Sequence, residues 1–221
     1  RSVTGTASGL GADGAAYERL MGPYVDAGFD LTDGLLSPLR IPPAHPVHLA
    51  RFGLQGIRSA HALANSRFET DEARALFAGL AAHSILSLRS PATAAYGLIL
   101  GVLGHVVGWP MARGGSQRIA DALVGIIEDV LLVLGDRAPD RFARALRRFR
   151  YGPGVVKLDW VLDGPIPWTN PQCADAGTVH LGGTLDEITA AEDDVMHGRI
   201  PERPYVLLAQ QSLFDPTRSP A

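Results

Sequence analysis

The part of the chain best suited to chemistry is the Arg-Gly-Gly-Ser-Gln stretch at residues 113–117. Two glycines followed by a serine let the backbone turn tightly, approach a ligand closely and cap the helix that follows. The free N–H groups and the dipole at the start of that helix would favour an anion or an electron-rich ring edge. The same residues also suit an ordinary turn with an N-cap, so the pattern alone leaves both interpretations open.

The seven histidines and the single cysteine are not spaced as metal ligands. His45 and His48 form the closest pair, but they lie on a proline-rich connector, and Cys173 has no nearby partner. No serine elbow of the G-x-S-x-G type is present, so a serine hydrolase is not supported. We therefore expect no metal site. His83, at the end of an apolar helix, is either a satisfied core residue or part of a substrate cavity.

A bare dinucleotide-binding pattern occurs near the N-terminus, at Gly9, Gly11 and Gly14. A true site needs a buried strand before the glycine-rich turn, and the preceding residues 3–8 are small and interrupted by glycine. We expect Gly11 and Asp13 to end one segment and begin the helix that carries Tyr17, with no nucleotide bound.

Amphipathic helices account for most of the first 90 residues. Tyr17, Leu20, Met21 and Tyr24 share one face of the first, which we expect to be kinked or interrupted at Gly22–Pro23. A second helix starts at Pro46 and carries an apolar face through Leu63. The third is capped by Thr70, with Asp71 and Glu72 in its first turn, and its inner face reaches Ser84.

A different kind of helix is predicted over residues 92–107, which are almost entirely apolar and include several glycines. At roughly sixteen residues it falls short of the roughly twenty needed to cross a bilayer, and His105 adds a further cost. We expect a central buried helix. Integral membrane insertion is disfavoured, and peripheral contact with a membrane is the alternative.

The last third of the chain changes to strands, at residues 155–162, 178–181 and 205–209. Between the last two, Thr184 and Glu187 form a capping box that starts a helix. The fold class is therefore α+β: a mainly helical lobe at residues 1–135 and a lobe of helix and strands at 136–221, with a small mixed or antiparallel sheet. A sheet edge left exposed near the C-terminus could pair with a second copy, giving a homo-oligomer.

Composition sets the broad class. The formal net charge is -3 and 46% of the residues are hydrophobic, so nucleic acid is not an expected partner. The basic helix at residues 141–150 is better explained as a solvated face than as a phosphate-binding surface. With one cysteine, no disulfide can form within the chain, and we expect a cytoplasmic protein.

Three segments together resemble a known family: residues 108–117 (GWPMARGGSQ), residues 147–160 (RRFRYGPGVVKLDW) and residues 178–183 (TVHLGG). The sequence is similar to the phytoene-dehydrogenase-related family of FAD-dependent oxidoreductases, flavoproteins of the amine-oxidase-like superfamily. The resemblance extends from about residue 10 to residue 221.

The resemblance implies that this chain is a substrate-binding domain without its flavin-binding segments. Members of the family carry an N-terminal Rossmann unit and a further flavin segment inserted after the double-glycine helix, whereas here Asp129 runs directly into Val130. Arg113, Gly114 and Gly115 would lie near the flavin edge in a complete enzyme. We expect the chain alone to bind no FAD tightly and to be inactive.

The resemblance also implies a hydrophobic small-molecule substrate, dehydrogenated or isomerised with the flavin as hydride acceptor. The expected lining residues are Trp109, Tyr151, Trp160, His180 and His83. Trp160 alternates with Leu158 and could instead be plain core. The alternative function is a cofactor-free module that binds an apolar ligand or a partner protein.

Overall fold

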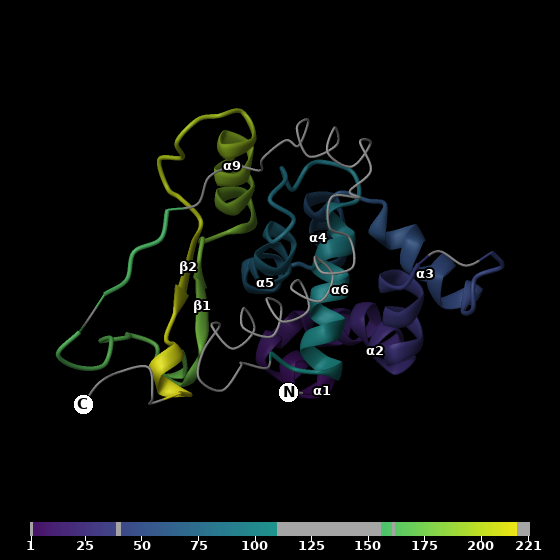
Figure 1. Ribbon diagram of the computed structural model, residues 1–221, viewed down its shortest axis with the longest axis horizontal. Coiled ribbons are helices and arrows are strands. Elements are labelled where there is room, and N and C mark those ends of the chain that lie inside the picture. The colour runs from purple at the N-terminus through teal and green to yellow at the C-terminus, as the bar shows by residue number, and fades with distance from the viewer. Residues whose placement is uncertain (1, 39–40, 110–155, 161, 216–221) are drawn as a thin grey trace, which may run out of the picture. The chain divides into compact units, whose positions relative to one another are not determined.

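The computed structural model describes residues 2–38, 41–109, 156–160 and 162–215 (Figure 1). The chain forms two compact units, Arg1–Trp109 with His180–Leu207 and Pro110–Val179 with Leu208–Ala221. The predicted α+β class is confirmed, because the described residues are mainly helical and carry a small antiparallel sheet. The predicted boundary at residue 135 lies outside the described residues.

The first unit is built mostly from helices. In chain order the described elements of the protein are α1 (Val3–Ala7), η1 (Ser8–Asp13), α2 (Gly14–Leu36), α3 (Pro46–Gly56), α4 (Ala60–Arg67), α5 (Asp71–Ala82), α6 (Thr93–Val106), η3 (Pro171–Asp175), β1 (Thr178–Leu181), α9 (Leu185–Met196), β2 (Val206–Ala209) and η4 (Gln211–Leu213). Strands β1 and β2 pair to form the sheet.

Helix α2 buries the face expected from its sequence, including Tyr17, Leu20, Met21 and Tyr24. The expected break at Gly22–Pro23 is wrong, since the helix continues through Pro23. The interruption falls instead at Gly28, whose φ of 48° lies in the left-handed region. Glycine adopts that conformation at little steric cost, whereas Pro23 removes only one backbone donor from an otherwise well-packed helix.

The helix that starts at Pro46 is shorter than its apolar pattern indicated. It ends at Gly56, and a separate helix α4 starts at Ala60. The Ser59 side chain accepts a hydrogen bond from the backbone of Ala62, so a new N-cap forms inside what looked like one amphipathic stretch.

Helices α5 and α6 pack together at the centre of the first unit (Figure 1). Gly97 on α6 receives the ring of Phe77 on α5, since a Cβ at Gly97 would lie 2.8 Å from the ring atom Cζ. Gly101 receives the end of Met21 from α2 in the same way, and Leu98 and Val102 are fully buried. The apolar helix is thus a central core element, as its sequence predicted.

The one histidine of α6 is satisfied inside the protein. Its Nε2 atom lies 2.8 Å from the hydroxyl of Tyr17, and burial raises the pKa of Tyr17 to about 12. No helix of the described residues is long and apolar enough to span a membrane.

A buried carboxylate holds the start of α5. The two oxygens of Asp13 accept hydrogen bonds from the backbone N–H groups of Glu69 and Thr70 at 2.7–3.0 Å, and from the Thr70 hydroxyl at 2.7 Å. Burial by itself would raise the pKa of this carboxyl, but the hydrogen bonds outweigh burial and hold the pKa below its usual value. Thr70 in turn caps α5, as predicted.

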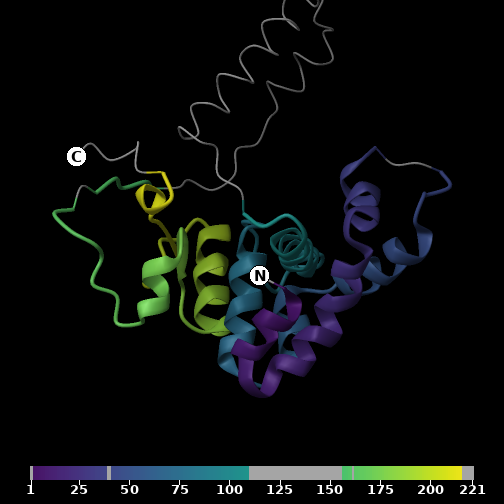
Figure 2. The same ribbon diagram turned by 90° about the horizontal axis from the view of Figure 1, so that it is seen from below.

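Two of the three predicted strands and the capping box are confirmed. Thr184 accepts from the backbone of Glu187, and the Glu187 carboxylate accepts from the backbone of Thr184, so α9 begins where expected. Figure 2 shows α9 beside α5, and the two helices are in contact. The strand predicted over residues 155–162 is wrong for its described part, because residues 156–160 and 162 have no strand structure.

In the second unit, Gln210 ties the segment before β1 to the residue that follows β2. Its side-chain amide donates to the carbonyls of Cys173 and Ala176, and its carbonyl oxygen accepts from the Trp168 indole at 3.0 Å. The Gln210 side chain thus holds η3 in place with both its amide NH₂ group and its carbonyl oxygen.

A pair of glycine substitutions tests the packing of α5 against α6. Gly97→Ala should lower the free energy of unfolding by about 1–2 kcal/mol, because the new methyl overlaps the Phe77 ring. Gly53→Ala on α3, where nothing lies within 4 Å of an added Cβ, should raise it by about 0.5–1 kcal/mol through helix propensity. Urea unfolding of both variants provides the measurement, and equal stability for the two would contradict the packing described.

Removal of the buried charge at residue 13 tests the cap of α5. Asp13→Asn should cost about 1.5–3 kcal/mol at neutral pH, because hydrogen bonds to a charged acceptor are replaced by weaker ones. A carboxyl with a lowered folded pKa stabilises the fold above its unfolded pKa and loses that effect as the pH falls through the folded value.

The difference between wild type and Asp13→Asn should therefore shrink below about pH 4. Chemical denaturation between neutral and acidic pH measures this difference. Asp26→Asn, at an exposed position on α2, is the matched control and should differ little from wild type at any pH. A difference for Asp13→Asn that stays constant to low pH would count against the charged cap.

Candidate functional site

Two of the histidines, far apart in the sequence, come together in the first unit. His83 lies at the C-terminal end of α5 and His180 lies on β1, and their ring centroids are 5.1 Å apart at an interplanar angle of 49°. His83 is exposed and His180 is partly buried. The sequence named both as substrate-lining candidates without indicating that they are neighbours.

Tyr205, which the sequence did not single out, fixes the orientation of His180. Its hydroxyl donates to the Gly79 carbonyl at 3.0 Å and lies 2.7 Å from Nδ1 of His180. When the Tyr205 proton is on the Gly79 carbonyl, the matching tautomer of His180 carries its proton on Nδ1 and donates it to the Tyr205 oxygen. In that tautomer Nε2 is an acceptor, and no described residue donates a hydrogen bond to it.

The surroundings disfavour the charged forms of His180, Tyr205 and Glu192. Burial lowers the pKa of His180, and the neighbouring His83 lowers it further. Burial raises the pKa of Tyr205, and the nearby Glu192 raises it as well. Burial also raises the pKa of Glu192. His180 and Tyr205 are therefore neutral at physiological pH, and the cluster is suited to an uncharged polar group.

Close packing explains Gly182 and Gly183 beside the cluster, whereas an added Cβ at Gly79 would make only ordinary van der Waals contact. A Cβ at Gly79 would lie 3.4 Å from both His180 Nδ1 and the Tyr205 hydroxyl, and a Cβ at Gly182 would lie 2.6 Å from the Tyr205 ring. Gly183 has a φ of 77° and sits against the Glu187 carboxylate. The two glycines after His180 thus let the chain pass over Tyr205 and turn into α9.

A polar group next to His83 has no partner in the described part of the chain. The hydroxyl oxygen of Ser84, at the end of α5, is buried and makes no hydrogen bond there. A buried hydroxyl without a partner is uncommon in folded proteins, and it marks this end of α5 as incompletely satisfied.

The other residues proposed from the sequence lie elsewhere or outside the described residues. Trp109 follows α6, is 63% exposed and has its indole against Gly104. Trp160, in the second unit, is 73% exposed, so the interpretation of this residue as core is wrong. Tyr151 and the three candidate flavin contacts, Arg113, Gly114 and Gly115, fall outside the described residues.

The glycines near the N-terminus do not fit a flavin dinucleotide. They follow helix α1, where a dinucleotide site requires a strand, and they lie in η1 and at the start of α2. A Cβ at Gly14 would lie 2.5 Å from the Ala7 carbonyl oxygen, so contact between two helical segments accounts for that glycine. Within the same described ranges, no three side chains are grouped as metal ligands.

Comparison of the chain with protein-family models, with curated proteins and with solved structures returns no match. The family resemblance therefore rests on the quoted sequence segments.

Proton binding by His180 gives the site a pH signature. A histidine with a lowered folded pKa makes the folded state bind fewer protons than the unfolded state, so stability should fall as the pH drops through about 6.5. His180→Gln cannot titrate and should lack this component of the pH dependence.

The measurement is the free energy of unfolding between pH 8 and pH 5, with the His180 ring followed by NMR. Wild type should lose stability relative to His180→Gln as the pH falls, and the His180 titration midpoint should lie below its usual value. A midpoint at or above the usual value would contradict the neutral assignment.

Proposed function

We propose that this chain is the substrate-binding domain of an FAD-dependent oxidoreductase similar to the phytoene-dehydrogenase-related family, with a hydrophobic small molecule as substrate. The observation that supports this most directly is the cluster of His83, His180 and Tyr205. His180 of this cluster lies on the TVHLGG segment, one of the three segments that carry the resemblance.

The cluster can bind the polar end of an otherwise apolar molecule. Nε2 of His180 offers an acceptor for a hydroxyl group, and the neutral state of His180 and Tyr205 favours an uncharged ligand. The strand residues beside them are apolar, and Leu181, Val206 and Leu207 are between 41% and 50% exposed. Exposed apolar side chains next to a few polar groups are typical of sites for apolar ligands.

Such a domain needs little acid-base chemistry of its own. When bound in the complete enzyme, the flavin supplies the capacity to accept a hydride. The part of this chain is to hold the substrate and exclude water, with His180 positioning its polar end. Arg113, Gly114 and Gly115 remain the proposed flavin neighbours, and the chain alone is proposed to be inactive.

A matched pair of ligands and a matched pair of variants test the substrate site. A pyrene-labelled long-chain alcohol should bind the chain more tightly than the corresponding pyrene-labelled hydrocarbon, because only the alcohol can donate to His180. His180→Leu should weaken binding of the alcohol about tenfold, the loss expected for one hydrogen bond, and should leave the hydrocarbon unaffected.

Fluorescence titration measures both affinities. His197→Leu, at the exposed C-terminal end of α9, is the control and should bind like wild type. Equal affinity for the two ligands, or unchanged alcohol binding in His180→Leu, would overturn the substrate site.

The flavin part of the proposal has a separate test. The chain should take up no FAD at stoichiometric concentration, whereas a chain with the family's flavin segments restored should take up FAD and pass electrons from substrate to it. Ligand binding without flavin uptake in the restored chain would favour the alternative, a cofactor-free module for apolar ligands or partner proteins.

A further inference from the structure

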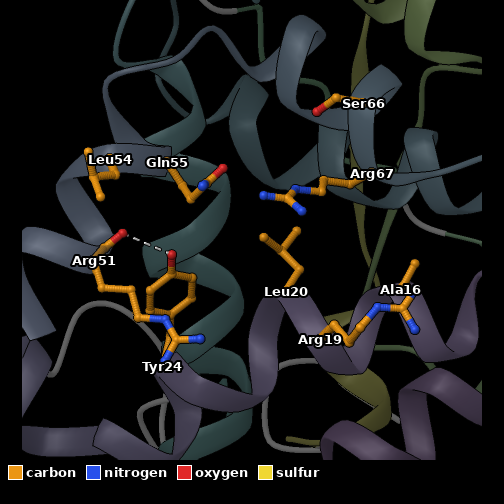
Figure 3. Close-up of a pocket in the computed structure, with 9 residues that line it drawn as sticks. All are labelled: Ala16, Arg19, Leu20, Tyr24, Arg51, Leu54, Gln55, Ser66 and Arg67. Atoms are coloured by element: carbon orange, nitrogen blue, oxygen red, sulfur yellow. Dashed lines mark hydrogen bonds between the residues drawn. The ribbon is translucent and has the colours of Figure 1, made fainter.

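A hollow of about 350 Å³ lies among helices α2, α3 and α4 of the first unit (Figure 3). Its volume is at the lower end of the range of small-molecule pockets, which is about 300–1,000 Å³. The lining residues are Ala16, Arg19, Leu20, Tyr24, Arg51, Leu54, Gln55, Ser66 and Arg67. None of them contributes to the cluster around His180.

The charge of this hollow is positive only. Three arginines line it and no acidic residue does. Among the described residues, none of the three has an ion-pair partner, whereas Arg74, Arg89, Arg199 and Arg203 each pair with a carboxylate. Three unpaired guanidinium groups around one space, on a chain of net negative charge, favour an anion as counter-charge.

Among the other polar groups of the lining, Gln55 can still donate, whereas the hydroxyls of Ser66 and Tyr24 already donate to the carbonyls of Leu63 and Arg51. Arg58, which is outside the lining, donates to the side-chain oxygen of Gln55 at 3.2 Å and to the Ser66 hydroxyl oxygen at 2.8 Å. Gln55 therefore has its NH₂ group left for a ligand. In Figure 3 the amide of Gln55 and the guanidinium of Arg67 point toward one another across the space.

The positive charges of Arg51 and Arg67 both act on the hydroxyl of Tyr24. Burial raises the pKa of Tyr24, and the positive charges of Arg51 and Arg67 act in the opposite direction on the same hydroxyl. Both guanidinium groups therefore act on the Tyr24 hydroxyl, which lines the same hollow. Arg19 lies at the edge of the hollow near Ala16 (Figure 3).

We propose that this hollow is a binding site for a phosphate group carried by pyrophosphate or by a small organic phosphate. A phosphate group has up to two negative charges and several acceptor oxygens, which match more than one guanidinium better than a single carboxylate does. Leu20, Leu54 and the Tyr24 ring supply apolar surface for an organic substituent. The site is independent of the proposed flavin-dependent function.

Isothermal titration of the whole chain with inorganic pyrophosphate tests the site, with sodium chloride at matched ionic strength as the blank. Wild type should bind with a sub-millimolar Kd. Arg51→Gln and Arg67→Gln should each weaken binding at least tenfold, and the double variant should abolish it. Arg89→Gln removes a guanidinium that pairs with Asp193 and should bind like wild type.

Further ligands decide between the anion classes. Phosphate esters of small alcohols should bind at least as well as pyrophosphate, because they can also contact the apolar surface. Tighter binding of citrate would overturn the assignment to phosphate. The absence of saturable pyrophosphate binding by wild type, or unchanged binding by the two arginine variants with normal thermal unfolding, would overturn the site itself.

Discussion

The buried carboxylate of Asp13 fixes the element on which both the core and the candidate site depend. Its hydrogen bonds to Glu69 and Thr70 hold the start of α5 against the N-terminal segment. Along α5, the Phe77 ring packs against Gly97 of α6. The Gly79 carbonyl accepts a hydrogen bond from the Tyr205 hydroxyl. At the end of the helix, the His83 ring lies beside the ring of His180. A change at the first turn would therefore propagate along one rigid helix to the site.

How much of this could be predicted from the sequence depends on the range of each interaction. The caps at Thr70 and Thr184 were predicted correctly, because a cap is decided by residues three positions apart. The strand predicted over residues 155–162 is wrong for its described part, because alternating apolar residues form a strand only where a partner edge exists. Val156 and Leu158 are instead 87% and 72% exposed.

The candidate site was predictable in part for the same reason. His83 and His180 could be named as single residues, but their contact depends on the packing of α5 against α9 and the chain around β1. Tyr205 gave no signal, since a tyrosine that precedes a short strand is ordinary. The arginine hollow was equally hidden, because Arg19, Arg51 and Arg67 come from three helices and meet only in the folded chain.

The cluster around His180 and the arginine-lined hollow, both in the first unit, differ in their electrostatics. Around His180, burial and a neighbouring histidine favour neutral side chains, so the site suits an uncharged group. Among α2, α3 and α4, three arginines lie at a more open surface and have no carboxylate partner among the described residues. The same helical scaffold can therefore present an apolar ligand site and an anion site without either perturbing the other through shared residues.

The apolar helix α6 shows why composition alone misleads about membranes and cofactors. Its glycines are matched by large side chains of its neighbours, Phe77 at Gly97 and Met21 at Gly101, so close packing accounts for them. The glycines after His180 have an equally local cause, since a Cβ at Gly182 would overlap the Tyr205 ring. At Gly97, Gly101 and Gly182, therefore, glycine reflects the close approach of the chain's own segments. Packing does not explain Nε2 of His180, the nitrogen that Tyr205 does not contact. The functional proposal depends on this atom as a hydrogen-bond acceptor.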